Sequence, residues 1–163
     1  LAASCAAAEV MPPPPAPAAA AGDTIYIIVR HAQKAAGDDP VLTAEGEAHA
    51  QALSAALADA GVTAIYATPY RRTQATAAPL AARTGIAVTR YEQGDAAATA
   101  ASIRAAGHHG TVLIVGHSNT VPTLVEAFAG VPVPAMPETD YSRLYATAVG
   151  GDGRARLLRL SMP

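Results

Sequence analysis

Two histidines stand directly after the two most apolar runs of the sequence. Residues 24–29 lead into Arg30 and His31, and residues 111–115 lead within two positions to His117. A neutral imidazole is a nucleophile toward phosphorus, and the fork of an arginine binds the non-bridging oxygens of a phosphoryl group at two points. These residue types in this pattern therefore indicate phosphoryl chemistry.

A second pair of cations follows another apolar run. Residues 62–67 lead to Arg71 and Arg72, which stand at the expected start of a helix, where backbone N–H groups also favour an anion. Ser118 is a candidate for phosphate binding and, alternatively, for capping the next helix. A serine hydrolase and a P-loop are both disfavoured, because neither Gly-x-Ser-x-Gly nor Gly-x-x-x-x-Gly-Lys-Ser/Thr is present.

The elements that must position these side chains alternate between strand and helix. Strands are expected at 24–29, 62–67, 86–89 and 111–115. Helices are expected from Thr43 to near Gly61 and at 72–83, 95–106 and 120–129. Two last segments, 143–149 and 155–160, flank a Gly-Gly-Asp-Gly turn and predict a β-hairpin.

This order predicts an α/β fold, a three-layer α/β/α sandwich with a mostly parallel sheet and a C-terminal hairpin. In such folds, ligands lie beyond the carboxyl ends of the strands, which is where His31 and His117 would emerge. His49, His108 and His109 have no such placement and are interpreted as ordinary surface or core residues.

The 163 residues suit one domain, with residues 1–23 as an Ala/Pro-rich tail and linker and residues 24–163 as the folded part. Eleven Lys and Arg against thirteen Asp and Glu give a net charge of −2, and Trp is absent. This composition argues against a nucleic-acid partner, because binding would need a basic surplus and stacking aromatics. Any phosphate site must depend on a local cluster of cations.

The single cysteine, Cys5, excludes an intrachain disulfide and leaves too few thiols for a common structural zinc site. Residues 1–5 resemble the end of a bacterial lipoprotein signal peptide. That resemblance implies a lipid on Cys5, a membrane tether and a periplasmic or cell-envelope location. The alternative is a tail without a role and a cytoplasmic location. No apolar run is long enough to predict a spanning helix.

Four motifs, in order, resemble the histidine phosphatase superfamily, which includes cofactor-dependent phosphoglycerate mutases and small bacterial phosphohistidine phosphatases. They are RHAQK at 30–34, TAEG at 43–46, TPYRRTQATA at 68–77 and GHSNT at 116–120. The resemblance extends from Thr24 to about Leu160. Two departures are Ala32, where the family usually has Gly, and Gln33, where an acidic residue is frequent.

The resemblance implies that His31 is the nucleophile and forms a covalent phosphohistidine. Arg30, Arg72 and His117 would complete the phosphate pocket, with Arg72 rather than Arg71 matching the family arginine. A carbonyl or side chain must hold the other ring nitrogen of the nucleophile, and the sequence does not name it. No metal and no cofactor are expected.

The acid that protonates the leaving group is open between Glu92 and Asp95, in the loop after the third strand. Asp95 could instead cap the following helix, and Glu92 could be a solvated loop carboxylate.

The expected function is a metal-independent phosphatase acting on phosphomonoesters, with a phosphorylated small molecule or phosphoprotein as partner. The alternative is a catalytically weak phosphate-binding or scaffold module. A mutase is less favoured, because the segments expected over the site, 34–42, 91–95 and 131–141, offer few cations for a second phosphate.

Overall fold

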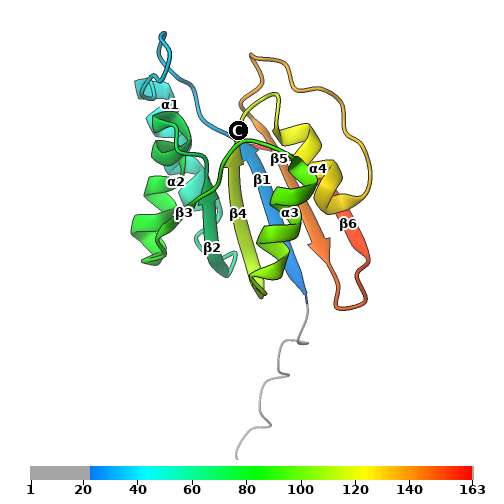
Figure 1. Ribbon diagram of the computed structural model, residues 1–163. Coiled ribbons are helices and arrows are strands. Elements are labelled where there is room, and N and C mark those ends of the chain that lie inside the picture. Colours follow the sequence, from blue (N-terminus) through cyan, green and yellow to red (C-terminus); the bar gives the residue numbers. More distant parts are fainter. Residues whose placement is uncertain (1–22, 163) are drawn as a thin grey trace, which may run out of the picture.

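The strands β1, β2 and β4 are short runs rich in β-branched residues. With β3, β5 and β6 they form one six-stranded sheet with the order β3-β2-β4-β1-β5-β6 (Figure 1). The computed structural model describes residues 23–162. The strands are β1 (Thr24–Arg30), β2 (Val62–Ala67), β3 (Val88–Arg90), β4 (Gly110–Gly116), β5 (Arg143–Val149) and β6 (Ala155–Ser161). The helices are α1 (Ala44–Ala56), α2 (Arg71–Thr84), α3 (Ala96–Ala105) and α4 (Val121–Ala129).

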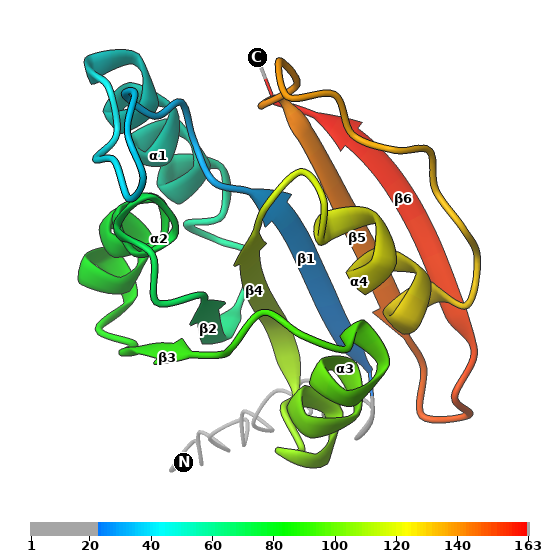
Figure 2. The ribbon, with the colours of Figure 1, turned by 45° about the horizontal axis from the view of Figure 1, so that its top comes forward.

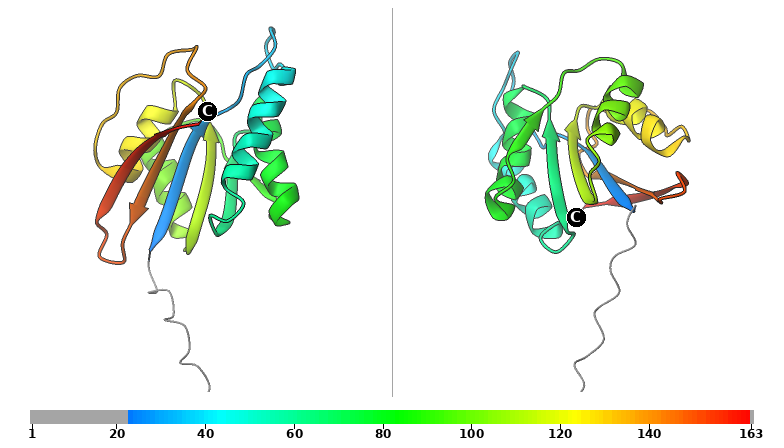
Figure 3. Two further views of the ribbon diagram at one scale, coloured as in Figure 1. Left: turned by 180° about the vertical axis from the view of Figure 1, so that it is seen from behind. Right: turned by 60° about the horizontal axis from the view of Figure 1, so that its bottom comes forward.

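The sheet is parallel from β3 to β1, and β5 and β6 extend it as an antiparallel hairpin. Helices α1 and α2 cover one face and α3 and α4 the other (Figures 2 and 3). The expected three-layer sandwich with a mostly parallel sheet and a terminal hairpin is therefore confirmed.

The central strand β1 is buried on both faces, as its unbroken apolar run predicts. Tyr26 and Ile28 belong to the core beneath α3 and α4, where Phe128 is the largest fully buried side chain. Ile27 and Val29 belong to the core beneath α1 and α2. Because side chains alternate along a strand, one short run supports both cores and holds β1 rigidly between them.

The helix ends follow the expected caps. The Thr43 side chain accepts a hydrogen bond from the Gly46 amide, and α2 and α4 end at Gly85 and Gly130, both left-handed. The expectation that the first helix reaches near Gly61 was too long. After Ala56, bonds between residues three apart replace the α-helical pattern, so the chain continues as tight turns.

The third strand is also displaced, to 88–90 instead of 86–89. The Ile86 amide bonds to the Thr84 hydroxyl at the end of α2, so it does not join the sheet.

The chain leaves β1 and β4 toward opposite faces. These strands are neighbours, yet β1 leads to α1 and β4 leads to α4 on the other side (Figure 2). Two diverging connections at adjacent carboxyl ends form a topological switch point, where ligands bind in open α/β sheets. The fold thus places His31 and His117, which begin these connections, at the switch point.

Cys5 and the proline-rich segment lie outside the described residues, so the lipid tether stays a prediction. Within residues 23–162, no helix is long and apolar enough to span a bilayer.

Substituting Gly46 tests how closely α1 packs on the segment that follows His31. Gly46 is buried, and an added Cβ would overlap the backbone carbonyl of Gln33. Gly46→Ala gains up to about 1 kcal/mol of helix propensity. We expect the overlap to outweigh this gain and to lower the free energy of unfolding by about 1 to 3 kcal/mol in urea denaturation.

The matched control for this prediction is Gly94→Ala, because a Cβ at Gly94 meets nothing within 4 Å. An unfolding midpoint for Gly46→Ala equal to that of the control would contradict the close packing.

Candidate active site

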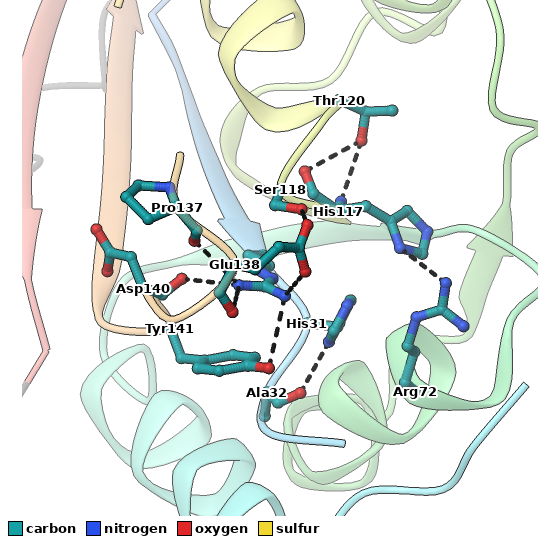
Figure 4. Close-up of polar contacts among 11 residues, drawn as sticks. His31, Ala32, Arg72, His117, Ser118, Thr120, Pro137, Glu138, Asp140 and Tyr141 are labelled. Carbon is teal, nitrogen blue, oxygen red and sulfur yellow. Dashed lines mark hydrogen bonds and ion pairs between the residues drawn. The ribbon is translucent and has the colours of Figure 1, made fainter. Parts of the chain in front are cut away.

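His31 and His117 lie side by side because β1 and β4 are paired in parallel with Arg30 opposite Gly116. The His31 amide extends this ladder by donating to the Gly116 carbonyl at 2.9 Å. The two ring centroids are 5.3 Å apart and the rings meet edge to face (Figure 4). Both residues are almost fully buried, 2% and 4% exposed. The sheet therefore brings the two sequence-predicted histidines together.

The ring of His31 is held by the backbone of the next residue, Ala32. Nδ1 lies 2.8 Å from the carbonyl oxygen of Ala32, and a carbonyl only accepts hydrogen bonds. The proton of the neutral ring is therefore on Nδ1, which leaves the lone pair of Nε2 available as a nucleophile. This carbonyl is the partner that the sequence did not name. Because it is a main-chain group, Ala in place of Gly at position 32 leaves it in place.

Arg72 contacts His117, as expected of the arginine at the start of α2. Its Nη2 lies 3.3 Å from Nδ1 of His117, and its guanidinium stacks 4.5 Å from the ring centroid of Tyr70. Arg71 is placed differently, because its backbone amide bonds to Asp39 and it lines another hollow on the surface. Asp39 also lies 3.6 Å from Nη1 of Arg72.

Arg30 binds the segment between α4 and β5. Its Nη1 donates to the carbonyls of Pro137, Glu138 and Asp140, at 3.3, 2.6 and 3.3 Å. Its guanidinium also lies 4.1 Å from the ring centroid of Tyr141. Arg30 therefore ties the segment between α4 and β5 to the end of β1.

Three buried donors of the two arginines have no hydrogen-bond partner among the described residues. They are Nε of Arg30 and Nε and Nη1 of Arg72. Buried cationic donors without partners are uncommon, and an anion such as a phosphoryl group supplies the acceptors they need.

Glu138 is the residue of this site that sequence reasoning missed. Its carboxylate accepts hydrogen bonds from the Ser118 hydroxyl and, at 2.8 Å, from Nη2 of Arg30. The Ser118 bond and the charge of Arg30 hold the pKa of Glu138 below its ordinary value, although burial partly opposes them. The segment 131–141 has no strand or helix periodicity. The sequence therefore contains no signal that Glu138 would lie beside Arg30.

Ser118 does not cap α4, because its hydroxyl is committed to Glu138. Thr120 precedes α4, but its hydroxyl accepts from the His117 amide instead of capping the helix.

The two carboxylates expected as proton donors make their contacts elsewhere than with the histidine pair. Asp95 accepts from the amides of Ala97 and Ala98, at 2.8 and 3.3 Å, and so caps α3. Glu92 is exposed and lines a surface hollow beside α3. Among the described residues, no hydrogen bond or ion pair joins either carboxylate to His31 or His117.

Both histidines are held neutral at physiological pH. Burial, followed by the charges of Arg30 and Arg72, lowers the pKa of His31 to about 4, although the bond to Ala32 acts in the opposite direction. Burial and the charge of Arg72 lower the pKa of His117 to about 3. A neutral imidazole beside two arginines is suited to attack an electrophilic anion. Within residues 23–162, no three His, Cys, Asp or Glu side chains are grouped as metal ligands.

The fold resembles that of several solved phosphatases. The protein histidine phosphatase SixA complexed with tungstate is 19% identical, with a TM-score of 0.70 over 84% of this chain and 96% of that one. A mycobacterial glucosyl-3-phosphoglycerate phosphatase is 18% identical, with a TM-score of 0.63 over 86% of this chain and 100% of that one. A protein described as mycobacterial hydrolase 2 is 17% identical, with a TM-score of 0.65 over 83% and 89%.

Among curated proteins, no sequence matches the chain significantly. Residues 26–94 match the family model described as histidine phosphatase superfamily (branch 1). This stretch contains Arg30, His31 and Arg72, and the pairing of β1 with β4 places His117 beside them. Residues 26–94 thus resemble the histidine phosphatase superfamily in sequence, and the chain resembles solved phosphatases in fold.

Proposed function

We propose that this protein is a metal-independent phosphatase that hydrolyses phosphomonoesters through a covalent phosphohistidine on His31. The observation that carries the proposal is the arrangement of His31 beside His117 and beside buried arginine donors that make no hydrogen bond within residues 23–162. Nδ1 of His31 is held by a carbonyl, which leaves the lone pair on Nε2. Phosphatases among the proteins of similar fold support the same reaction class.

In the first step, Nε2 of His31 attacks phosphorus, an N–P bond forms and the bond from phosphorus to the leaving oxygen breaks. The leaving oxygen takes up a proton. In the second step, water attacks phosphorus, the N–P bond breaks, and inorganic phosphate and free His31 result. Arg72 and Arg30 would donate to the non-bridging oxygens, on which negative charge develops.

Among the carboxyl groups, Glu92 stays the candidate source of the proton for the leaving oxygen, from its place in the sequence. Glu138 is not suited to supply this proton, because Ser118 and Arg30 donate to its carboxylate and hold its pKa low. Asp95 is less suited, because its carboxylate is committed to the first turn of α3.

The surface beside the site favours a substrate with a single phosphate. Two hollows meet at Glu138, one lined also by Glu45 and Asp140 and the other by Glu126. Neither hollow is lined by Lys or Arg, so a second phosphate would face carboxylates. This charge pattern supports a phosphatase over a mutase, with a phosphorylated small molecule or a phosphoprotein as substrate.

The first test is hydrolysis of p-nitrophenyl phosphate in excess EDTA by the parent protein and by His31→Ala. We expect EDTA-resistant activity that falls by about 10³-fold or more in the variant, because the nucleophile is lost. Acid quenching of the parent with labelled substrate should trap an acid-labile phosphohistidine.

The control is His109→Ala. This variant removes an exposed histidine just before β4, at the opposite end of that strand from His117. A parent that binds vanadate but forms no phosphohistidine and releases no phosphate would instead support the phosphate-binding module.

The assignment of Arg72 rather than Arg71 is tested by comparing two alanine variants. Arg72→Ala removes a guanidinium from beside His117 and should lower kcat by about 10²- to 10³-fold, the cost of one oxyanion donor. Arg71→Ala leaves the backbone bond to Asp39 intact and should change kcat by less than about tenfold. Equal losses in the two variants would contradict the assignment.

The low pKa values of the histidines make stability depend on pH. An unfolded histidine takes up a proton near its ordinary pKa of 6.5, whereas folded His117 does so only near 3. Between these values the unfolded chain binds more protons, so the free energy of unfolding must fall as pH drops below 6.5.

We expect urea denaturation from pH 7 to pH 4.5 to show this decline, and a shallower one in His117→Gln, which cannot be protonated. Parallel curves for the two proteins would show that burial does not depress the pKa of His117.

A further inference from the structure

We propose that Thr68 is a positioning residue that keeps the proton of His117 on Nε2, so that Nδ1 presents its lone pair on the side of Arg72. The effect on catalysis rests on the proposed function, whereas the position of the proton does not. Thr68 lies directly after β2, is fully buried, and its hydroxyl is 2.9 Å from Nε2 of His117.

Arg72 settles which nitrogen of His117 carries the proton. A guanidinium has only donors, and Nη2 of Arg72 approaches Nδ1 of His117 at 3.3 Å. A proton on Nδ1 would set two donors against each other. In the neutral ring, Nδ1 therefore accepts, the proton is on Nε2, and this N–H donates to Thr68.

Thr68 can accept this bond because its own hydroxyl proton is donated to Thr73. Its hydroxyl lies 2.8 Å from the Thr73 hydroxyl, which in turn lies 2.8 Å from the Tyr70 carbonyl and 2.9 Å from the Thr68 carbonyl. When Thr73 donates its proton to one of these carbonyls, its oxygen can accept from Thr68, which agrees with the direction that Arg72 sets. Protons point from His117 to Thr68, from Thr68 to Thr73, and from Thr73 to a carbonyl. Both threonines are 0% exposed, so water does not offer alternative partners.

The two histidines consequently have opposite tautomers. His31 carries its proton on Nδ1 because of the Ala32 carbonyl, and His117 carries its proton on Nε2 because of Thr68. The chain after β2 supplies both groups that bracket the His117 ring, Thr68 from the turn on one nitrogen and Arg72 from the first turn of α2 on the other.

The consequence for phosphoryl transfer concerns where His117 takes up a proton. Since the Nε2 proton stays bonded to Thr68, a second proton can enter only at Nδ1, beside Arg72. Protonated His117 would then donate from Nδ1 to a phosphoryl oxygen without any movement of Thr68. Without the hydroxyl at position 68, the neutral ring can exchange its proton between the two nitrogens, and the fraction with a free Nδ1 falls.

The experiment measures the His117 tautomer from the ring nitrogen chemical shifts, by long-range ¹H–¹⁵N correlation at pH 7 in the absence of any ligand. We expect the parent and Thr68→Ser to carry the proton on Nε2, and Thr68→Val to show a mixed or reversed tautomer. The control is Thr147→Val, because Thr147 is equally buried and its hydroxyl has no partner in the described structure. This control should retain the parental tautomer.

Activity on p-nitrophenyl phosphate provides the second measurement. Loss of one buried hydrogen-bond partner corresponds to about a five- to hundredfold fall in kcat for Thr68→Val. Thr68→Ser should recover most of this loss, Thr147→Val should lose little, and KM should change less than kcat.

The proposal is overturned if parental His117 carries its proton on Nδ1, or if folded Thr68→Val keeps the parental tautomer. The first result needs no variant, so the proposal stays testable even if Thr68→Val does not fold. If the parent has the expected tautomer but hydrolyses no phosphate ester, the proposed function fails while the assignment of Thr68 stands.

Discussion

The site depends on the parallel pairing of β1 and β4. This register places Arg30 opposite Gly116, so the next residues of both strands, His31 and His117, emerge as neighbours. A slip of one residue would turn every side chain of β1 to the other face and exchange the contents of the two cores. The packing of Tyr26 and Ile28 under α4 and of Ile27 and Val29 under α1 and α2 therefore fixes the separation of the histidine rings.

Sequence reasoning found those parts of the site that follow from strand ends. His31 and His117 come directly after strands, and Arg72 lies in the first turn of a helix, places that periodicity displays in one sequence. The choice of Arg72 over Arg71 came from the resemblance to the family. Asp95 was ambiguous, because a carboxylate before a helix suits both capping and acid catalysis. Two amides of α3 decide in favour of the cap.

Glu138 and the surroundings of Arg30 could not be predicted in the same way. The segment 131–141 is an irregular connection whose path depends on tertiary contacts, chiefly with the guanidinium of Arg30. The hydrogen bonds that set the tautomers are likewise invisible in sequence. The bond of His31 depends on how its ring turns toward the Ala32 carbonyl, and the bond of His117 joins groups 49 residues apart. Type and order of elements are local properties, whereas hydrogen-bond direction is a property of the assembled site.

Arg30 holds the segment after α4 largely through main-chain groups, so the position of this segment depends little on most of its side chains. Three of its contacts are with main-chain carbonyls, which every amino acid provides. Apart from Glu138, whose carboxylate also bonds to Arg30, side chains in this stretch can therefore change during evolution or in a library without loss of the main-chain contacts. The protein thus has a stretch beside its histidine pair where new ligand preferences can be explored at low cost to folding, while the buried histidines and arginines stay constant.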